Sequence, residues 1–236
     1  MGNLDQKEMK ALAGRSAVDA LVKSGMKLGL GTGSTAIPAV KHIGALMSEG
    51  KLTDIKAVPT SFQTVLECEA LGIPIFSLNS RDIGGKLDLS IDGADEVDSR
   101  NFCTKGGGGA LLLEKIIAYA SASYAIVVDE SKIVDHLGLT FAIPIEVIPE
   151  ARVPVIQAIE ALGAEPVVRE AVRKAGPVIT EHGNFIVDVR LKLAADPAAL
   201  EAEFNRIPGV VENGLFTRLR PSVFIARQDG TVERRD

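Results

Sequence analysis

The chain has 236 residues, of which 46% are hydrophobic, 24% charged and only 4% aromatic, and its formal net charge is −5. This composition is typical of a globular protein with room for one or two domains. The scarcity of aromatic residues and the lack of a basic tract argue against a nucleic-acid partner. No apolar run approaches membrane-spanning length, so no membrane partner is expected.

The few cysteines and histidines do not form a recognisable metal or disulfide pattern. Two isolated cysteines, Cys68 and Cys103, predict a reducing compartment without a disulfide framework. Cys103 lies near a glycine-rich segment, but no histidine is close in sequence to activate it, so we interpret it as structural. The polar N-terminus does not resemble a signal peptide. We expect a cytoplasmic protein, or an organellar one if a targeting segment has been removed.

Strands and helices alternate along the first part of the chain. Helices are predicted over 6–23, 36–48, 63–71 and 110–120, and strands over 26–30, 55–58, 73–77, 87–91 and 125–128. This alternation predicts an α/β fold with a doubly wound, mainly parallel, Rossmann-like sheet. Such sheets bind ligands beyond the carboxyl ends of their strands, where the loops after Leu30, Ile91 and Val128 lie.

The pattern changes after residue 138. Strands are predicted over 141–148, 166–169, 185–191 and 210–215, and helices over 153–162 and 197–205. The order β-α-β-β-α-β indicates a smaller ferredoxin-like α+β domain over 139–217. A strand over 223–226 is expected to return to the first sheet, so the Rossmann-like domain comprises 1–138 and 218–236.

A short glycine-rich segment follows the first strand. In Gly31-Thr32-Gly33-Ser34-Thr35, backbone amides and hydroxyls can hold a phosphate at the start of a helix. The segment is not a Walker loop, and it lacks the complete dinucleotide fingerprint. The alternative interpretation is a tight turn between a strand and a helix.

An acidic run, Asp92-Gly93-Ala94-Asp95-Glu96, follows the strand over 87–91. A solvated loop, a helix cap, a site for a hard cation and a catalytic role all remain open for it. Asp92 and Asp95 flank a small Gly-Ala pair, so both carboxylates can face one ligand. Glu96 and Asp98 are expected to face outward.

Lys105 precedes four glycines, Gly106 to Gly109, and Glu114 lies near the start of the helix that follows. Consecutive glycines are entropically costly, and they let amide N–H groups approach a ligand. The alternative for Glu114 is a helix-dipole carboxylate or an ion pair with Lys115 or Lys105.

Taken together, these segments resemble the type A ribose-5-phosphate isomerases. The resemblance is carried by Gly31–Thr35, Ile91–Glu96, Lys105–Gly109 and Glu114–Ile117, with further matches over 129–132, 144–149, 207–211 and 214–216. It runs nearly end to end. It implies interconversion of D-ribose 5-phosphate and D-ribulose 5-phosphate through an enediolate in the non-oxidative pentose phosphate pathway, without a metal or organic cofactor.

The resemblance also implies residue roles. Glu114 would be the proton-transferring base, and Asp92, Asp95 and Lys105 would contact the sugar, with the roles of the two aspartates not separable. The further substrate-binding residues that it implies are Thr32, Gly33, Ser34, Thr35, Gly93, Ala94, Gly106, Gly107, Gly108, Lys132 and a lysine of the first helix, for which Lys10 is the first candidate and Lys7 the second.

Two further expectations concern function class and assembly. A non-catalytic sugar-phosphate sensor is the alternative, but a sensor does not need Glu114 together with Lys105. The resemblance implies a homodimer or homotetramer. The segment 139–216 is expected to contribute to the interface. It has one alternating apolar face for the domain's own helices, and a remaining apolar patch would drive association; the alternating residues are Phe141, Ile143, Ile145 and Val147.

Overall fold

The computed structural model describes residues 3–236, and their contacts form two compact units. The larger unit contains the chain up to Ala94, Leu113–Lys132 and Leu219–Asp236, and the smaller unit contains Asp95–Leu112 and Ile133–Arg218. This grouping differs from the domain limits predicted from sequence, because 95–112 and 133–138 fall in the smaller unit.

The larger unit is built on a six-stranded sheet in the order β13-β12-β6-β3-β1-β2. Its strands are β1 (Lys27–Leu30), β2 (Lys56–Pro59), β3 (Leu87–Gly93), β6 (Ser121–Asp129), β12 (Ser222–Ala226) and β13 (Val232–Arg235). All neighbours are parallel except β13, which pairs antiparallel with β12. The predicted doubly wound, mainly parallel sheet is therefore confirmed, as is the return of 223–226 to it.

The predicted strand over 73–77 is wrong. Only Ile75 forms a single bridge, to Ala57 on β2. Pro74 lacks a backbone N–H, so it cannot donate to a strand ladder, and its carbonyl accepts from the Ala57 N–H at 3.0 Å. The segment 73–77 therefore forms one bridge beside β2 and no strand.

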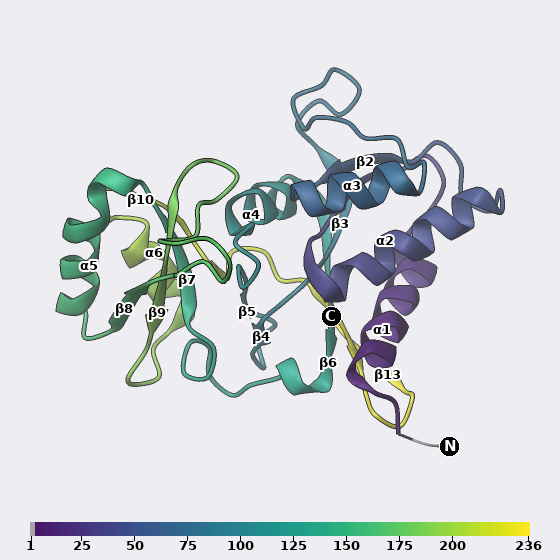
Figure 1. The fold of residues 1–236 in the computed structure, drawn as a ribbon. Helices are drawn as coiled ribbons and strands as arrows, with labels where there is room; N and C mark the ends of the chain where they lie inside the picture. Colours follow the sequence, from purple (N-terminus) through teal and green to yellow (C-terminus); the bar gives the residue numbers. More distant parts are fainter. Residues whose placement is uncertain (1–2) are drawn as a thin grey trace. The chain divides into compact units, whose positions relative to one another are not determined.

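The helices of the larger unit are α1 (Gln6–Leu21), α2 (Gly33–Ser48), α3 (Phe62–Ala70) and, from Leu113 onward, α4 (Leu111–Tyr119), with the 3₁₀ turn η1 (Glu130–Lys132) after β6. Apolar residues of α1, α2 and α3 share one core with side chains of β1 and β3 such as Leu28 and Ile91. Figure 1 shows α1 and α2 next to each other. They approach closely because Gly14 has no side chain: a Cβ there would lie 2.9 Å from the Ala39 amide nitrogen.

The other face of this sheet contacts α4. Ile117 of α4 packs with Val58 of β2 in a separate apolar cluster. Side chains alternate between faces along a strand, so Gly29 and Ser90 point to the α4 face. A Cβ on Gly29 would lie 2.4 Å from Ile117 Cγ2 and 3.0 Å from Ser90 Cβ. The glycine therefore lets α4 rest directly on β1 and β3.

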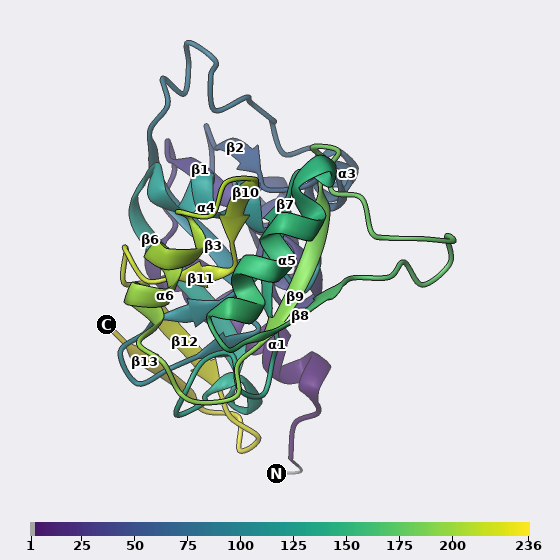
Figure 2. The same cartoon turned by 90° about the vertical axis from the view of Figure 1, so that its left-hand side faces the viewer.

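The smaller unit contains a four-stranded antiparallel sheet in the order β10-β7-β9-β8. Its elements are β7 (Ile143–Val147), η2 (Pro149–Ala151), α5 (Arg152–Ala161), β8 (Glu165–Val168), β9 (Phe185–Arg190), α6 (Pro197–Phe204) and β10 (Val210–Asn213). Residues of α5 and α6 share an apolar core with this sheet, and Figure 2 shows α5 running across its strands.

Asp196 caps α6 by accepting from the Ala199 N–H, with Pro197 at the first helical position, as predicted. The ferredoxin-like arrangement is confirmed.

A third, three-stranded sheet in the order β11-β5-β4 also belongs to the smaller unit. Its strands are β4 (Glu96–Val97), β5 (Cys103–Thr104) and β11 (Leu215–Phe216). The predicted strand over 210–215 is therefore two strands in different sheets. They separate at Gly214, where a Cβ would lie 2.2 Å from the Lys105 carbonyl oxygen.

The expectation that Glu96 and Asp98 face outward is also wrong, because both are buried. The Glu96 carboxylate accepts from the Thr104 hydroxyl at 3.1 Å and from the amides of Gly138 and Phe141 at 2.8 Å each. It thus ties the acidic run to residues near 140. These bonds and the β5–β11 pairing explain why 95–112 and 133–138 group with the smaller unit.

The two cysteines have the surroundings of structural thiols. Both are buried, and no disulfide joins them. Burial raises the pKa of the Cys68 thiol to about 11, which keeps it protonated at neutral pH. Among residues 3–236, no helix is long and apolar enough to cross a membrane.

Candidate active site

The glycine-rich segment after β1 forms the start of α2. Thr32 is the N-cap, but its hydroxyl does not cap the helix. It instead contacts the hydroxyl oxygens of Thr60 at 2.7 Å and Ser61 at 2.6 Å. Ser34 and Thr35 lie in the first turn of α2, where amide N–H groups have no carbonyl partner within the helix. The segment therefore presents amide donors at a helix N-terminus, which favours an anion.

Asp92 lies directly against this segment. Its Oδ1 accepts from the Thr32 N–H at 3.2 Å and from the Gly93 N–H at 2.7 Å. A Cβ on Gly31 would lie 2.1 Å from the same oxygen. Gly93 in turn contacts Thr35, whose Cβ would be 3.1 Å from a Cβ at Gly93. The predicted phosphate loop, Gly31 to Thr35, therefore contacts Asp92 at the carboxyl ends of β1 and β3.

Glu114 lies on the same face of the sheet as Asp92. Asp92 follows Ser90 by two positions on β3, so it points to the same face and lies about 6.6 Å further toward the carboxyl end. Glu114 precedes Ile117 by three residues, about 4.5 Å along α4. A helix that leads into a parallel strand runs antiparallel to it, so the N-terminus of α4 lies at the carboxyl edge. Both carboxyl groups are buried there, Asp92 with 2% and Glu114 with 6% of its surface exposed.

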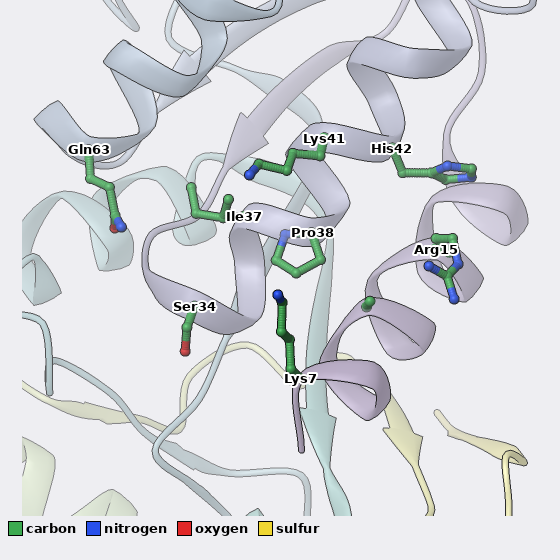
Figure 3. Close-up of a pocket in the computed structure, with 9 residues that line it drawn as sticks. Lys7, Arg15, Ser34, Ile37, Pro38, Lys41, His42 and Gln63 are labelled. Carbon is green, nitrogen blue, oxygen red and sulfur yellow. The ribbon is translucent and has the colours of Figure 1, made fainter. Parts of the chain in front are cut away.

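Lysines from two segments lie at the same edge. The Lys10 ammonium of α1 donates to the Ser34 hydroxyl at 3.1 Å, so it reaches the N-terminus of α2. Lys7 lines a groove of about 610 Å³ between α1 and α2, together with Ser34 and Pro38 (Figure 3). Lys132 ends η1 after β6, the strand that neighbours β3. The geometry therefore favours Lys10 over Lys7 as the first-helix lysine at the phosphate loop.

Of the remaining predicted residues, Ala94 ends the first segment of the larger unit, whereas Asp95, Lys105 and Gly106 to Gly108 lie in the smaller unit. The Asp95 carboxylate accepts from the Gly107 N–H at 2.8 Å, and a Cβ on Gly107 would lie 2.6 Å from its other oxygen. The Lys105 N–H donates to the Gly214 carbonyl at 2.8 Å, and its ammonium lies 5.6 Å from the centre of the Phe216 ring. Asp95 and the glycine loop thus form one hydrogen-bonded group.

Several residues that support these groups were not predicted. Thr64 donates its hydroxyl proton to the Gly31 carbonyl at 2.8 Å, and Gln63 accepts from the Gly33 N–H at 2.9 Å. In the smaller unit, Arg169 donates to the Gly106 and Gly107 carbonyls at 3.0 Å each. Nothing in the local sequence around Arg169 indicates this contact, because its partners lie more than sixty residues earlier in the chain.

The acidic run does not form a metal-binding cluster in this structure. Within the described part of the chain, no group of three or more His, Cys, Asp or Glu side chains could hold a metal ion. Asp92 and Glu96 are instead hydrogen-bonded to backbone amides.

Comparisons with known proteins agree on one family. A family model described as ribose 5-phosphate isomerase A (phosphoriboisomerase A) matches residues 56–230. Ribose-5-phosphate isomerase A of Treponema denticola is 55% identical over 237 residues, which cover 98% of this chain and 99% of the relative. The chain belongs to the ribose 5-phosphate isomerase A family.

Solved structures of this family have the same fold. The structure of ribose 5-phosphate isomerase A from Methanocaldococcus jannaschii is 42% identical, with a TM-score of 0.90 over 97% of this chain and 98% of its own. A D-ribose-5-phosphate isomerase solved in complex with phospho-erythronic acid is 40% identical, with a TM-score of 0.94 over 99% and 100% of the two chains. This isomerase family therefore accounts for the chain from end to end.

The contact between Gly31 and Asp92 gives a testable prediction. In this isomerase, Gly31→Ala is expected to displace the Asp92 carboxylate and to lower kcat/KM strongly, with a loss of about 1–3 kcal/mol in the free energy of unfolding from overpacking. Steady-state kinetics and denaturant unfolding measure the two effects.

Gly25→Ala provides the matched control. Gly25 has a φ of +83° but open space around a Cβ, so the substitution strains the backbone without touching Asp92. It should destabilise the protein by about 1–2 kcal/mol and leave kcat/KM unchanged. Equal kinetic losses in both variants would contradict the assigned role of the Gly31 contact.

Proposed function

We propose that this chain interconverts D-ribose 5-phosphate and D-ribulose 5-phosphate through an enediolate, the reaction for which its family is named. The observation that carries the proposal is the meeting of two buried carboxyl groups, Asp92 and Glu114, with an anion-favouring helix N-terminus at one edge of the larger sheet. A sugar phosphate needs both a proton-transferring group and a phosphate site, and this edge offers both. Glu114 and Lys105 together argue against the alternative of a non-catalytic sensor.

Glu114 is proposed as the general base. It would take the proton from C2 of the ring-opened aldose and return it to C1 of the enediolate, which gives the ketose. One carboxylate can serve both carbons because they are adjacent. Its burial supports this role, since a carboxyl group removed from water is a stronger base toward a bound substrate.

The donors proposed for the developing oxyanion are Lys105 and the amides of Gly106 and Gly108, while the Gly107 amide holds the Asp95 carboxylate. Oriented donors stabilise charge that develops in the transition state without rearranging during the reaction. Asp92 or Asp95 would assist ring opening and move hydroxyl protons, and Gly93 and Ala94 would allow the sugar to approach the backbone between them.

The phosphate end is proposed to lie at the N-terminus of α2. The amides of Ser34 and Thr35 would receive the phosphate, with Lys10 and Lys132 supplying positive charge. Gly33 would shape the turn, because its amide donates to Gln63. The Thr32 hydroxyl contacts Thr60 and Ser61, so Thr32 would contribute mainly by shaping the segment.

The purified protein should form ribulose 5-phosphate from ribose 5-phosphate, and the rate should survive exhaustive chelation. The reaction as proposed needs only a base and oriented donors from the protein. A coupled or direct assay of ketose formation, with and without chelator, measures this. Activity that disappears with the chelator and returns with a divalent cation would instead assign Asp92 and Asp95 as metal ligands.

Glu114→Gln is expected to lower kcat by about 10²–10⁴-fold, the usual contribution of general-base catalysis, while the protein keeps its fold and binds substrate. Circular dichroism and steady-state kinetics distinguish these effects. Glu201→Gln is the control, because Glu201 is also buried and its carboxylate accepts from the N–H and hydroxyl of Thr217, outside the proposed site. A Glu114→Gln enzyme with near-normal turnover would remove Glu114 from the role of base.

Lys10→Met is expected to raise KM for ribose 5-phosphate by about 10- to 100-fold, because a hydrogen bond to a charged group contributes about 1.5–3 kcal/mol. Lys7→Met, three residues away on the same helix, should have a much smaller effect. Binding of unphosphorylated ribose should be unaffected in both. If the Lys7 variant loses more affinity than the Lys10 variant, the two assignments must be exchanged.

A homo-oligomer, a dimer or a tetramer, is proposed through the smaller unit. This unit exposes Val172, Leu193 and Val167, the last on the edge strand β8. Exposed apolar residues and strand edges are commonly covered by association. Sedimentation should show a shift to smaller species in the double variant Val167→Lys/Val172→Lys, but not in Leu66→Lys on α3 of the larger unit. A wild-type monomer at micromolar concentration would refute the proposal.

A further inference from the structure

We propose that Arg169 is a positioning residue for the isomerase reaction. It holds two peptide groups of the glycine loop so that their N–H groups face Asp95 and the bound sugar. The inference rests on the proposed function, since it concerns the loop that is proposed to stabilise the oxyanion.

Arg169 connects the glycine loop to Asp188, a residue of the antiparallel sheet. Its Nη1 donates to the carbonyl oxygens of Gly106 and Gly107 at 3.0 Å each. Its Nε and Nη2 donate to the two carboxylate oxygens of Asp188 on β9, at 2.8 and 2.5 Å. This bidentate pair is the geometry that best fixes the plane of a guanidinium group. One partly buried side chain therefore holds two consecutive carbonyl groups at once.

The orientation of those carbonyls determines where the amides point. The loop peptides are trans, so each N–H points away from the carbonyl oxygen of the same peptide group. The Gly106 carbonyl shares its peptide group with the Gly107 N–H, which donates to Asp95 at 2.8 Å. This peptide group thus lies between the Arg169 cation and the Asp95 carboxylate. The Gly107 carbonyl likewise turns the Gly108 N–H away from Arg169.

The glycine loop has open space beside Gly108. Gly107 and Gly108 are exposed, and a Cβ on Gly108 would meet no atom within 4 Å. A run of four glycines has the largest conformational freedom of any backbone. Without an external contact, its amides would have to be ordered during the reaction, whereas a preorganised donor requires no such rearrangement. Arg169 supplies this order from outside the loop.

The chemistry requires arginine in particular. A lysine ammonium is a single point charge, so it cannot pair with both Asp188 oxygens and hold two carbonyls in one plane. Arg169→Lys and Arg169→Met should therefore both impair the loop, the methionine variant more severely.

The test compares kinetics with a matched ion pair, which like Arg169–Asp188 joins a residue of one strand of the β8–β9 pair to a residue just after the other strand. In Arg169→Met, kcat is expected to fall by about tenfold or more, with a much smaller change in KM, because the affected donors act on charge that develops in the transition state. Lys192→Met removes the exposed pair of Lys192 with Glu165 on β8, 3.4 Å apart, and should leave kcat unchanged. Asp188→Asn keeps Arg169 but weakens its anchor, so an intermediate loss is expected.

A second readout does not depend on activity. Amide hydrogen exchange followed by NMR should show faster exchange at Gly107 in Arg169→Met than in the wild type, and no change in Lys192→Met. Thermal unfolding verifies that each variant is folded, and Asp188→Asn decides the question if Arg169→Met does not fold. Wild-type kcat in folded Arg169 and Asp188 variants would overturn the proposal. A wild-type protein without isomerase activity would refute the proposed function instead, while faster Gly107 exchange would still demonstrate the contact.

Discussion

Two glycines, Gly29 in β1 and Gly31 directly after it, impose the constraint on which the site in the larger unit depends. Gly29 and Gly31 point to the α4 face, and a Cβ at either would overlap Ile117 or Asp92. Because the first position is empty, α4 rests on the sheet and carries Glu114 to its carboxyl edge. Because the second is empty, Asp92 reaches the backbone amide of Thr32. Because a protein interior is close-packed, a side chain at either position would displace α4 or Asp92 from this edge.

In the smaller unit, charged and polar side chains arrange irregular backbone. Glu96 binds two distant amides, and Glu146 accepts from Thr180 and Asn184. Arg169 does the same for carbonyl groups of the glycine loop. A buried charged group is stable only when its hydrogen-bonding capacity is satisfied, so each of these side chains holds its loop in one conformation. The result is a preorganised loop built largely from residues that have little conformational preference of their own.

The chain is acidic overall, yet its proposed substrate is an anion. Local features resolve this contrast: amide N–H groups at the start of α2, the Lys10 ammonium beside Ser34, and Lys132 after β6. Such donors act over a few ångströms, whereas the net charge of −5 is spread over the surface and screened by salt. Net charge therefore says little about which small molecule such a site accepts.

The sequence by itself determined the alternation of strands and helices, the parallel and antiparallel sheets, and the segments that carry the chemistry. The elements follow from local periodicity. The segments that carry the chemistry are recognised by unusual runs of residues, such as the four consecutive glycines after Lys105. Only the tertiary structure decided that Glu96 and Asp98 are buried, that the segment 73–77 forms a single bridge, and that Lys10 reaches Ser34. The contact of Arg169 with the glycine loop spans 62 and 63 residues. Such contacts depend on how distant segments pack, and hydrophobic periodicity carries no information about which polar partner a side chain will find.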